Sequence, residues 1–270
     1  MIHMNLREII MDAIKYPISD TRKFLIFCAL IILMSLSTIL PSYGLKNDTL
    51  TIILSLVTLI VSFIVLGYSV EVIKAGSEGV DALPDFDYVK QFVIGIKALI
   101  LEIIYFIIPA VIVLLVASAS GLFTSFTKIV YASIDAMAEG ASSLTMITAA
   151  IPQSTMSAFT NALTVTLIVA IVLFVIFSLM SFTGLVRFAK TGRGTEGLRF
   201  REIFRNMSKV GFVKIIVTLI VIYIIALVLS AVIGLIGLIP YVGVFIGMFV
   251  GVPFIILFVY RAVGLLYAEA

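Results

Sequence analysis

The sequence predicts an all-α polytopic membrane bundle with six transmembrane helices. Of its 270 residues 62% are hydrophobic and 12% are charged, whereas soluble domains carry about 45–50% apolar and about 25% charged residues. The apolar residues gather in six runs, each near the roughly 20 residues that a bilayer core requires. Lys and Arg also fall almost entirely on one side of these runs. We therefore treat residues 1–270 as a single integral membrane domain.

The six spans are separated by polar or glycine-containing connections. The fifth and sixth lie in one apolar stretch, 210–260, which is too long for a single span, so we divide it at the turn cluster of Gly234, Gly237 and Pro240. The spans are expected at 24–40, 50–70, 96–117, 162–182, 212–233 and 241–260.

The distribution of positive charge predicts the topology. Only Lys46 and Lys128 of the 18 Lys and Arg lie in the first and third connections or the adjoining loops. The positive-inside rule therefore places both termini and the two basic connections in the cytoplasm, with the protein in the plasma membrane. The run at 24–40 is longer than the apolar region of a signal peptide and is expected to remain as an anchor.

Three amphipathic segments are expected to lie on the cytoplasmic face as interfacial helices. The first belongs to the N-terminal segment 1–23. The second follows Pro84, with Asp85 as its expected N-cap. The apolar stripes are Leu6, Ile9, Ile10, Ala13 and Ile14; Val89, Phe92, Val93 and Ile96; and Phe200, Ile203, Phe204 and Met207.

Segments 67–109 and 184–226 form a possible internal repeat. Each contains the end of a span, a glycine-rich turn, an interfacial helix and a returning span, with matching Gly, Lys and Tyr positions. Both copies run in the same direction, so a symmetry axis would follow the membrane normal. Chance similarity between apolar spans is the alternative explanation.

The outer connection 118–161 is longer than ordinary loops, which rarely exceed about 15 residues. Apolar residues between Leu122 and Met137 keep helical spacing. A short helix is therefore expected there, in preference to disorder.

The second connection carries a string, Gly76-Ser-Glu-Gly-Val-Asp-Ala-Leu-Pro-Asp-Phe-Asp87, followed by Phe92, Gly95 and Lys97 and by Tyr105-Phe-Ile-Ile-Pro109. With the close of the chain from 239 to 270, it resembles a prokaryotic, often archaeal, family of multi-pass membrane proteins described as a domain of unknown function. The family pattern is Leu-Pro-x-Phe-Asp and then Phe-x-x-Gly-x-Lys. Glu102 departs from that pattern. The resemblance implies the fold and the membrane location and supplies no activity.

Glu102 is the ionisable residue that the sequence places deepest in a span. A charge at the bilayer centre costs roughly 2.5–3.5 kcal/mol, so such a residue normally faces protein or water. We expect Tyr105 beside it and Tyr223, from the other copy of the repeat, within reach. A proton or cation relay is one interpretation, and a carboxylate near the interface that reaches water or a Lys is the other.

Other polar residues do not form a recognisable catalytic set. One Cys and one His in the whole chain exclude a Cys/His zinc site and leave no Ser-His-Asp arrangement beyond His3. The carboxylates at 78, 81, 85 and 87 lack a calcium-loop pattern, and the glycine-rich turns lack a phosphate-loop pattern. We expect no enzyme, no metal, no cofactor and no nucleic-acid partner.

Two further groups have expected roles in binding and packing. Gly243, Gly247 and Gly251 form a stripe along the last span, where another helix can approach closely, either in the same chain or in a second copy. The basic fourth connection is expected to hold anionic lipid headgroups, at about 1 kcal/mol per charge. The residues chosen for that role are Arg199, Arg201, Arg205 and Lys209.

These features suggest two functions. The first is a membrane protein that moves or senses a small or lipid-like solute, which the parallel repeat and Glu102 favour. The alternative is a structural or assembly subunit that binds lipid and a protein partner, or a second copy of itself, at the cytoplasmic face.

The predicted topology is testable by cysteine labelling in intact cells. Single cysteines at Ser77 and Thr195 should be shielded from an impermeant thiol reagent, because both positions lie in basic connections, while a cysteine at Ser143 should react. External labelling at Ser77 or Thr195 would overturn this topology.

Overall fold

The computed structural model describes residues 5–42, 44–45, 47–239 and 242–268. Across this part of the chain the regular elements are all helical. Six helices are long and apolar enough to cross a membrane, which confirms the predicted all-α, six-span architecture. Their ranges are Thr21–Pro41, Asp48–Glu78, Tyr88–Ala119, Gln153–Thr191, Phe212–Gly237 and Gly247–Leu266.

The chain divides into two compact units, where the sequence analysis treated it as a single domain. Unit 1 comprises Met1–Glu102 and Leu179–Ala270, and unit 2 comprises Ile103–Ser178. Two long helices, α4 (Tyr88–Ala119) and α7 (Gln153–Thr191), contribute residues to both units.

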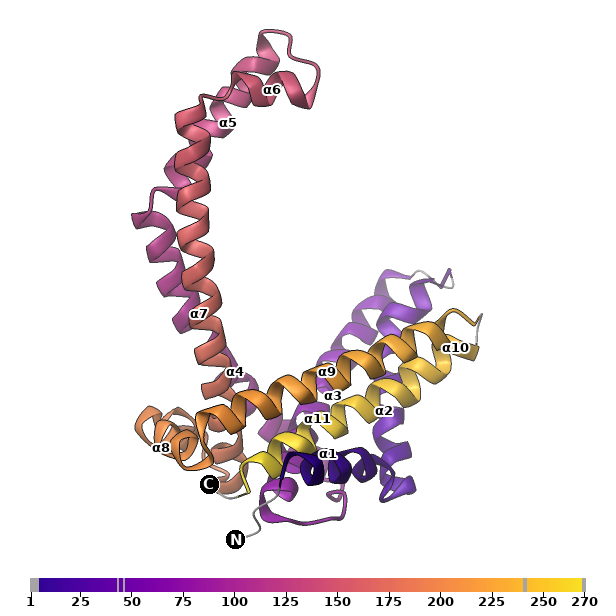
Figure 1. The fold of residues 1–270 in the computed structure, drawn as a ribbon. Helices are drawn as coiled ribbons and strands as arrows, with labels where there is room; N and C mark the ends of the chain where they lie inside the picture. Colours follow the sequence, from indigo (N-terminus) through magenta and orange to yellow (C-terminus); the bar gives the residue numbers. More distant parts are fainter. Residues whose placement is uncertain (1–4, 43, 46, 240–241, 269–270) are drawn as a thin grey trace. The chain divides into compact units, whose positions relative to one another are not determined.

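Unit 1 contains most of the helices (Figure 1). Besides the ends of α4 and α7, it holds α1 (Leu6–Lys15), η1 (Tyr16–Ile18), α2 (Thr21–Ser42), α3 (Asp48–Glu78), η2 (Gly194–Leu198), α8 (Phe200–Val210), α9 (Phe212–Gly237), α10 (Val242–Ile246), the π-helical segment η3 (Gly247–Gly251) and α11 (Val252–Leu266).

Local sequence signals begin and end several of these helices. Asn5 and Glu8 form a capping box at α1, in which each side chain accepts a hydrogen bond from the other residue's backbone N–H, at 2.7 and 2.9 Å. Asn47 caps α3, which ends at Gly79 in the left-handed conformation with φ 70°. Gly211, with φ 93°, separates α8 from α9.

Unit 2 consists of the remaining parts of α4 and α7 with α5 (Leu122–Ala138) and α6 (Leu144–Ala150). The helix expected within the connection 118–161 is present as α5. With α6 and the beginning of α7, the connection 118–161 is largely helical. Beside it, Phe106 of α4 packs against Phe174 of α7, with ring centroids 5.5 Å apart.

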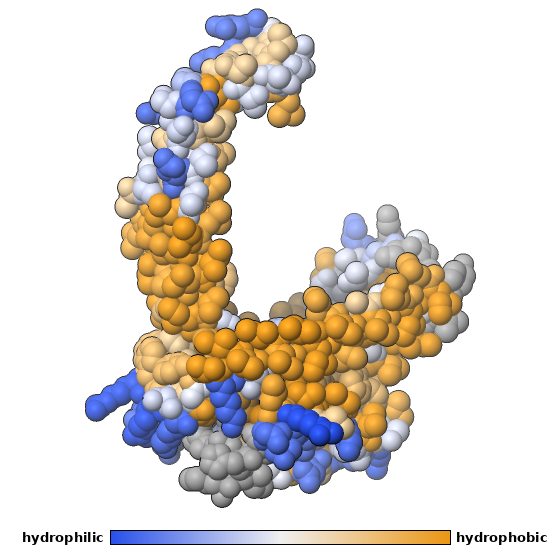
Figure 2. All heavy atoms as spheres, in the orientation of Figure 1, coloured by the Kyte–Doolittle hydropathy of each residue, from blue (hydrophilic) through white to orange (hydrophobic). Residues whose placement is uncertain are grey.

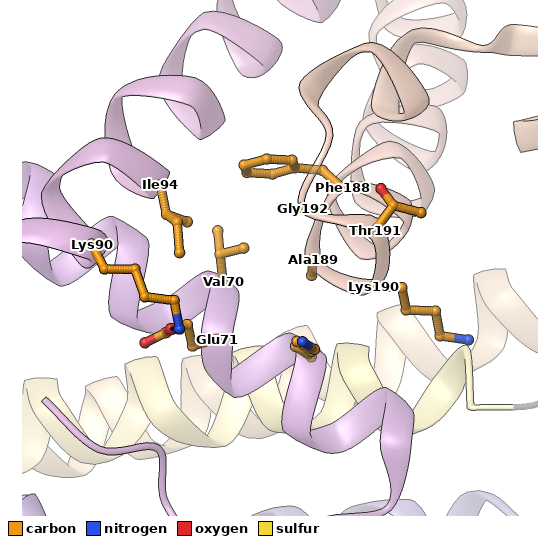
Figure 3. A pocket seen from close by; sticks show the side chains of 10 residues that line it. Val70, Glu71, Lys90, Ile94, Phe188, Ala189, Lys190, Thr191 and Gly192 are labelled. Carbon is orange, nitrogen blue, oxygen red and sulfur yellow. Dashed lines mark ion pairs between the residues drawn. The ribbon is translucent and has the colours of Figure 1, made fainter. Parts of the chain in front are cut away.

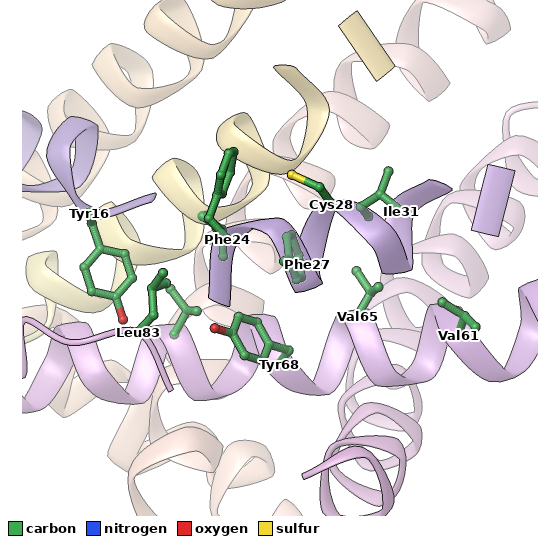
Figure 4. Packing of buried hydrophobic residues seen from close by; sticks show 11 residues of the cluster. Tyr16, Phe24, Phe27, Cys28, Ile31, Val61, Val65, Tyr68 and Leu83 are labelled. Atoms are coloured by element: carbon green, nitrogen blue, oxygen red, sulfur yellow. The ribbon is translucent and has the colours of Figure 1, made fainter. Parts of the chain in front are cut away.

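The core of unit 1 lies between α2, α3 and α11 and includes η1 (Figure 4). Phe27 and Tyr68 are fully buried, with ring centroids 5.2 Å apart. Cys28 lies in the same cluster as a small apolar side chain. Burial of these apolar groups stabilises unit 1.

Glycines allow α3 to make two close helix contacts. A Cβ atom at Gly67 would lie 1.8 Å from the Gln91 carbonyl oxygen of α4, and one at Gly95 would lie 1.9 Å from the Phe63 carbonyl oxygen of α3. On another part of α3, a Cβ at Gly264 of α11 would lie 2.4 Å from the Ile73 oxygen. Only glycine permits backbones to approach so closely.

The structure corrects two expectations about interfacial helices. The segment from Val89 to Ile96 is the beginning of α4 itself, and Asp87, not Asp85, caps it by accepting from the Lys90 N–H at 3.1 Å. The helix expected within 1–23 is α1, but Ile9 and Ala13 of its apolar stripe are buried where α1 packs alongside α11 (Figure 1). Part of that stripe therefore faces protein and not lipid.

The two copies of the possible repeat also differ. In 67–109 the helix continues without a break through Gly95, whereas in 184–226 the chain breaks at Gly211 between α8 and α9. The structure also shows that Ser77 is buried, so Thr195, which is exposed, is the better labelling position.

Gly95→Ala should destabilise unit 1, because its methyl group would collide with the backbone of Phe63. Overpacking of this kind costs about 1–3 kcal/mol, which thermal unfolding in detergent measures. Gly234→Ala in α9 is the matched control, since a Cβ there meets no atom within 4 Å. Equal melting temperatures for the two variants would contradict the close α3–α4 contact.

Candidate functional site

Charged side chains of unit 1 gather at one end, around α1 and α8 (Figure 2). The loop 80–87 between α3 and α4 lies at this charged end, and side chains from five elements hydrogen-bond to its backbone. Arg261 Nη1 donates to Val80 O (2.5 Å), Tyr16 Oη to Ala82 O (3.1 Å), Lys23 Nζ to Leu83 O (2.6 Å), Tyr68 Oη to Pro84 O (3.2 Å) and Gln91 Nε2 to Asp85 O (2.9 Å).

The Leu-Pro-x-Phe-Asp string of this loop has a structural role at each apolar or capping position. Leu83 is buried in the core of unit 1. Phe86 stacks on Tyr68, with centroids 4.4 Å apart and an interplanar angle of 8°. Asp87 caps α4. The string therefore fixes the path of the chain from α3 into α4.

The acidic residues of the connection contact different partners. Glu78 pairs with Lys74 at 3.8 Å, and Asp81 pairs with Arg261 at 3.2 Å. The Lys23 ammonium, 2.9 Å from Asp85, holds the pKa of that carboxyl below its ordinary value through a hydrogen bond and charge attraction. The described residues contain no cluster of three or more His, Cys, Asp or Glu suited to a metal ion.

Arg261 is the buried cation of this end, with 1% of its surface exposed. Its guanidinium makes a two-pronged pair with Asp12 of α1, at 2.7 and 3.2 Å, and lies 4.3 Å from the centre of the Tyr16 ring. Burial raises the pKa of the Tyr16 phenol to about 12. In the sequence Arg261 counts toward the charge bias and the family resemblance at the close of the chain, and its ion pair was missed, although a lone Arg late in an apolar helix predicts a nearby counter-ion.

A second polar cluster joins α3 to the start of α4. The Glu71 carboxylate lies 2.5 Å from Lys90 Nζ and accepts a hydrogen bond of 2.7 Å from the fully buried Gln91 amide. Beside Glu71 is a pocket of about 170 Å³ (Figure 3). Its lining residues are Val70, Glu71, Lys74, Lys90, Ile94, Phe188, Ala189, Lys190, Thr191 and Gly192.

The structure places the four predicted lipid-binding residues on or beside α8, where they divide into two pairs. Arg199 pairs with Glu196 at 2.9 Å, and Arg205 pairs with Glu202. Arg201 and Lys209 are exposed and have no ion pair to another described residue. The last two therefore carry the uncompensated charge of this helix.

The apolar stripe of α8 contains both buried and exposed residues. Ile203 and Met207 are buried in protein, whereas Phe200 and Phe204 are 38% and 47% exposed. Arg187 of α7 fixes the approach to α8, because it contacts the Glu196 carboxylate of η2 at 2.7 Å. The exposed phenylalanines thus project from a helix with a fixed position.

The structure brings together only some of the ionisable residues that the sequence predicts to meet within the spans. Glu102 is half-buried and forms no hydrogen bond or ion pair with another described side chain, Tyr105 is buried, and Tyr223 is 52% exposed. Tyr223 contacts the ring of Phe182 with centroids 6.4 Å apart. Tyr260, which the sequence analysis missed, interacts electrostatically with both Glu102 and Tyr223.

The predicted glycine stripe faces α9 of the same chain. A Cβ atom at Gly243 would lie 1.8 Å from the Ile236 oxygen, while Cβ atoms at Gly247 and Gly251 would lie 2.9 and 2.4 Å from side-chain atoms of Ile233. An apolar cavity of about 220 Å³ lies along this contact. The geometry is that of packing within the monomer.

Asp12→Asn should destabilise the protein far more than Asp81→Asn. Loss of the Asp12 charge leaves the buried Arg261 guanidinium without its two-pronged partner, at a cost on the order of 3 kcal/mol. The Asp81 side chain is 92% exposed, and exposed pairs contribute under about 1 kcal/mol. Thermal unfolding in detergent measures both, and similar losses would show that Asp12 is not the principal counter-ion.

Comparison with known proteins places the chain in a family without adding an activity. No curated protein and no solved structure matches it. A family model described as "Protein of unknown function (DUF4013)" matches residues 50–242. This range includes the Leu-Pro-x-Phe-Asp loop and most of the six spans, and it confirms the resemblance to an uncharacterised family, although it ends before Arg261. The chain belongs to this DUF4013 family.

Proposed function

We propose that this membrane protein binds and senses anionic lipid through the surface of α8. One observation carries the proposal: α8 exposes Phe200 and Phe204 beside Arg201 and Lys209, while Ile203 and Met207 hold the helix on the protein. Aromatic side chains next to basic residues are typical of helices in the headgroup layer. Each uncompensated Lys or Arg near an anionic surface contributes about 1 kcal/mol.

The proposal includes location, orientation and partners. We place the protein in the plasma membrane with the charged end and both termini in the cytoplasm, because 16 of the 18 Lys and Arg lie on that side of the spans. Its partners are membrane lipids, with no nucleic acid. We assign it no enzymatic activity and no cofactor.

Movement of a small or lipid-like solute is a second candidate function. Glu102, Tyr223 and Tyr260 support it, because they bring ionisable groups from three spans into one neighbourhood, and such groups often mark ion or solute pathways. The alternative of a structural or assembly subunit would use the same α8 surface to bind a protein partner or a second copy of the chain.

The lipid proposal is testable with a single-tryptophan reporter. The chain contains no Trp, so Phe204→Trp supplies one at the exposed face of α8. In nanodiscs its fluorescence should be quenched more strongly by brominated phosphatidylglycerol than by brominated phosphatidylcholine at equal fractions. The combined changes Arg201→Gln and Lys209→Gln should remove most of this preference, about fivefold per charge.

Lys128→Gln in the same reporter background is the matched control, because it removes an exposed charge from α5. It should leave the lipid preference unchanged. Equal quenching by the two lipids in the reporter protein would sink the proposal, as would a preference that survives neutralisation of Arg201 and Lys209. In that case the exposed Phe residues of α8 would point to a protein partner.

A further inference from the structure

The pocket beside Glu71 is formed by three helices of unit 1, and each contributes one lysine and at least one apolar residue. Helix α3 supplies Val70 and Lys74, α4 supplies Lys90 and Ile94, and α7 supplies Phe188 and Lys190. Figure 3 shows Lys90 and Lys190 on opposite sides of the pocket.

The order of these residues gives the pocket two layers. In α3 and α7, which end at Glu78 and Thr191, the apolar residue comes first and the Lys lies nearer the helix end. In α4, which begins at Tyr88, the order is reversed. All three lysines therefore lie toward the charged end, and all three apolar residues lie toward the spans. A pocket with a cationic rim and an apolar inner wall matches a molecule with an anionic head and a hydrocarbon body.

Charges around the pocket favour an anion. Its lining holds three lysines and a single carboxylate, Glu71, and Glu71 is already bonded by Lys90 and Gln91. Glu78, outside the lining, approaches Lys74 at 3.8 Å. Lys190 Nζ donates to the Tyr267 carbonyl at 3.1 Å, and its side chain points away from Lys90 (Figure 3). The Lys74 and Lys90 side chains are 47% and 60% exposed, so a ligand can reach them.

The pocket also lies between the two copies of the possible repeat. Lys74-Ala-Gly76 and Lys190-Thr-Gly192 occupy corresponding positions in 67–109 and 184–226. In transporters built from repeats, substrate sites lie at the interface between the copies. This placement is independent of the charges and supports a binding site here, while the charges indicate the kind of ligand.

We infer that this pocket binds the phosphate-bearing headgroup of one anionic phospholipid. Lys74 and Lys90 contact the phosphate, Lys190 adds positive charge at the rim, and Val70, Ile94 and Phe188 pack against the glycerol and the first carbons of the chains. A volume of about 170 Å³ is several times the roughly 30 Å³ that a water molecule occupies, so a phosphate with part of its glycerol fits. Basic pockets between membrane helices bind such headgroups in other proteins. The site is separate from the surface of α8 and does not depend on it.

Native mass spectrometry of the full chain in a mild detergent, titrated with phosphatidylglycerol, tests the inference. One equivalent should bind with high affinity. Lys74→Gln should raise its Kd about fivefold, the effect of one charge near an anion, and Lys74→Arg should restore binding because it keeps the charge. Lys74 has an exposed side chain, so these variants should fold, and thermal unfolding checks that they do.

Lys128→Gln is the matched control, since it removes one exposed charge from α5 and none from the pocket or from the surface of α8. It should leave the Kd of the tight equivalent unchanged. Inorganic phosphate at millimolar concentration should not displace the lipid, because it lacks the apolar contacts. Displacement by phosphate would overturn the lipid assignment, and equal Kd values for Lys74→Gln and Lys128→Gln would overturn the site itself.

Discussion

The hydrogen bonds to the backbone of the 80–87 loop are the constraint on which unit 1 depends. Five of its carbonyl oxygens accept from side chains of α11, η1, α2, α3 and α4. The loop lies outside any helix, so its carbonyl groups take their hydrogen bonds from side chains or water. Long donors, chiefly Arg261, Lys23 and Gln91, supply these bonds, and in doing so they fix the relative positions of helices that are far apart in the sequence.

Close helix contacts at glycine make those hydrogen bonds possible. Gly76 and Gly264 bring α3 and α11 together next to Arg261, and Gly67 and Gly95 bring α3 and α4 together next to Gln91. At each contact a long polar side chain is thereby placed against the loop. Apolar packing without a small residue would keep the helices about 8–10 Å apart, where these side chains would not reach the same carbonyls. The lysine-lined pocket depends on the same arrangement, because Gln91 and Lys90 both hold Glu71 at its edge.

The elements that the sequence predicts well are those defined by local patterns. The six spans follow from hydropathy, α5 and α8 follow from helical spacing, and the turn after α3 follows from Gly79. Tertiary contacts decide the rest. Asp85 and Asp87 are both suited to cap α4, but Asp85 forms an ion pair with Lys23 of α2. The local sequence pattern around α4 does not show that ion pair.

The candidate sites show the same division. Hydrophobic periodicity alone identifies α8 and its basic residues, but it does not separate Ile203, which is buried, from Phe204, which is exposed. That difference depends on the surface against which the helix packs. The pocket residues come from three helices and have no common sequence pattern except the Lys-x-Gly pair, so only the fold reveals that they meet.

The π-helical segment η3 has a consequence for the register of the last helix. A π turn holds about one residue more than an α-helical turn, because its hydrogen bonds run from residue i to residue i+5. Each residue rotates a helix by about 100°, so the extra residue within Gly247–Gly251 sets the direction in which every later side chain points. In this chain Gly243, before the segment, and Gly247, at its start, face α9, while Arg261 beyond it faces Asp12. A regular α-helix with one residue fewer here would not provide both contacts. It would keep either the glycine contact with α9 or the contact of Arg261 with Asp12.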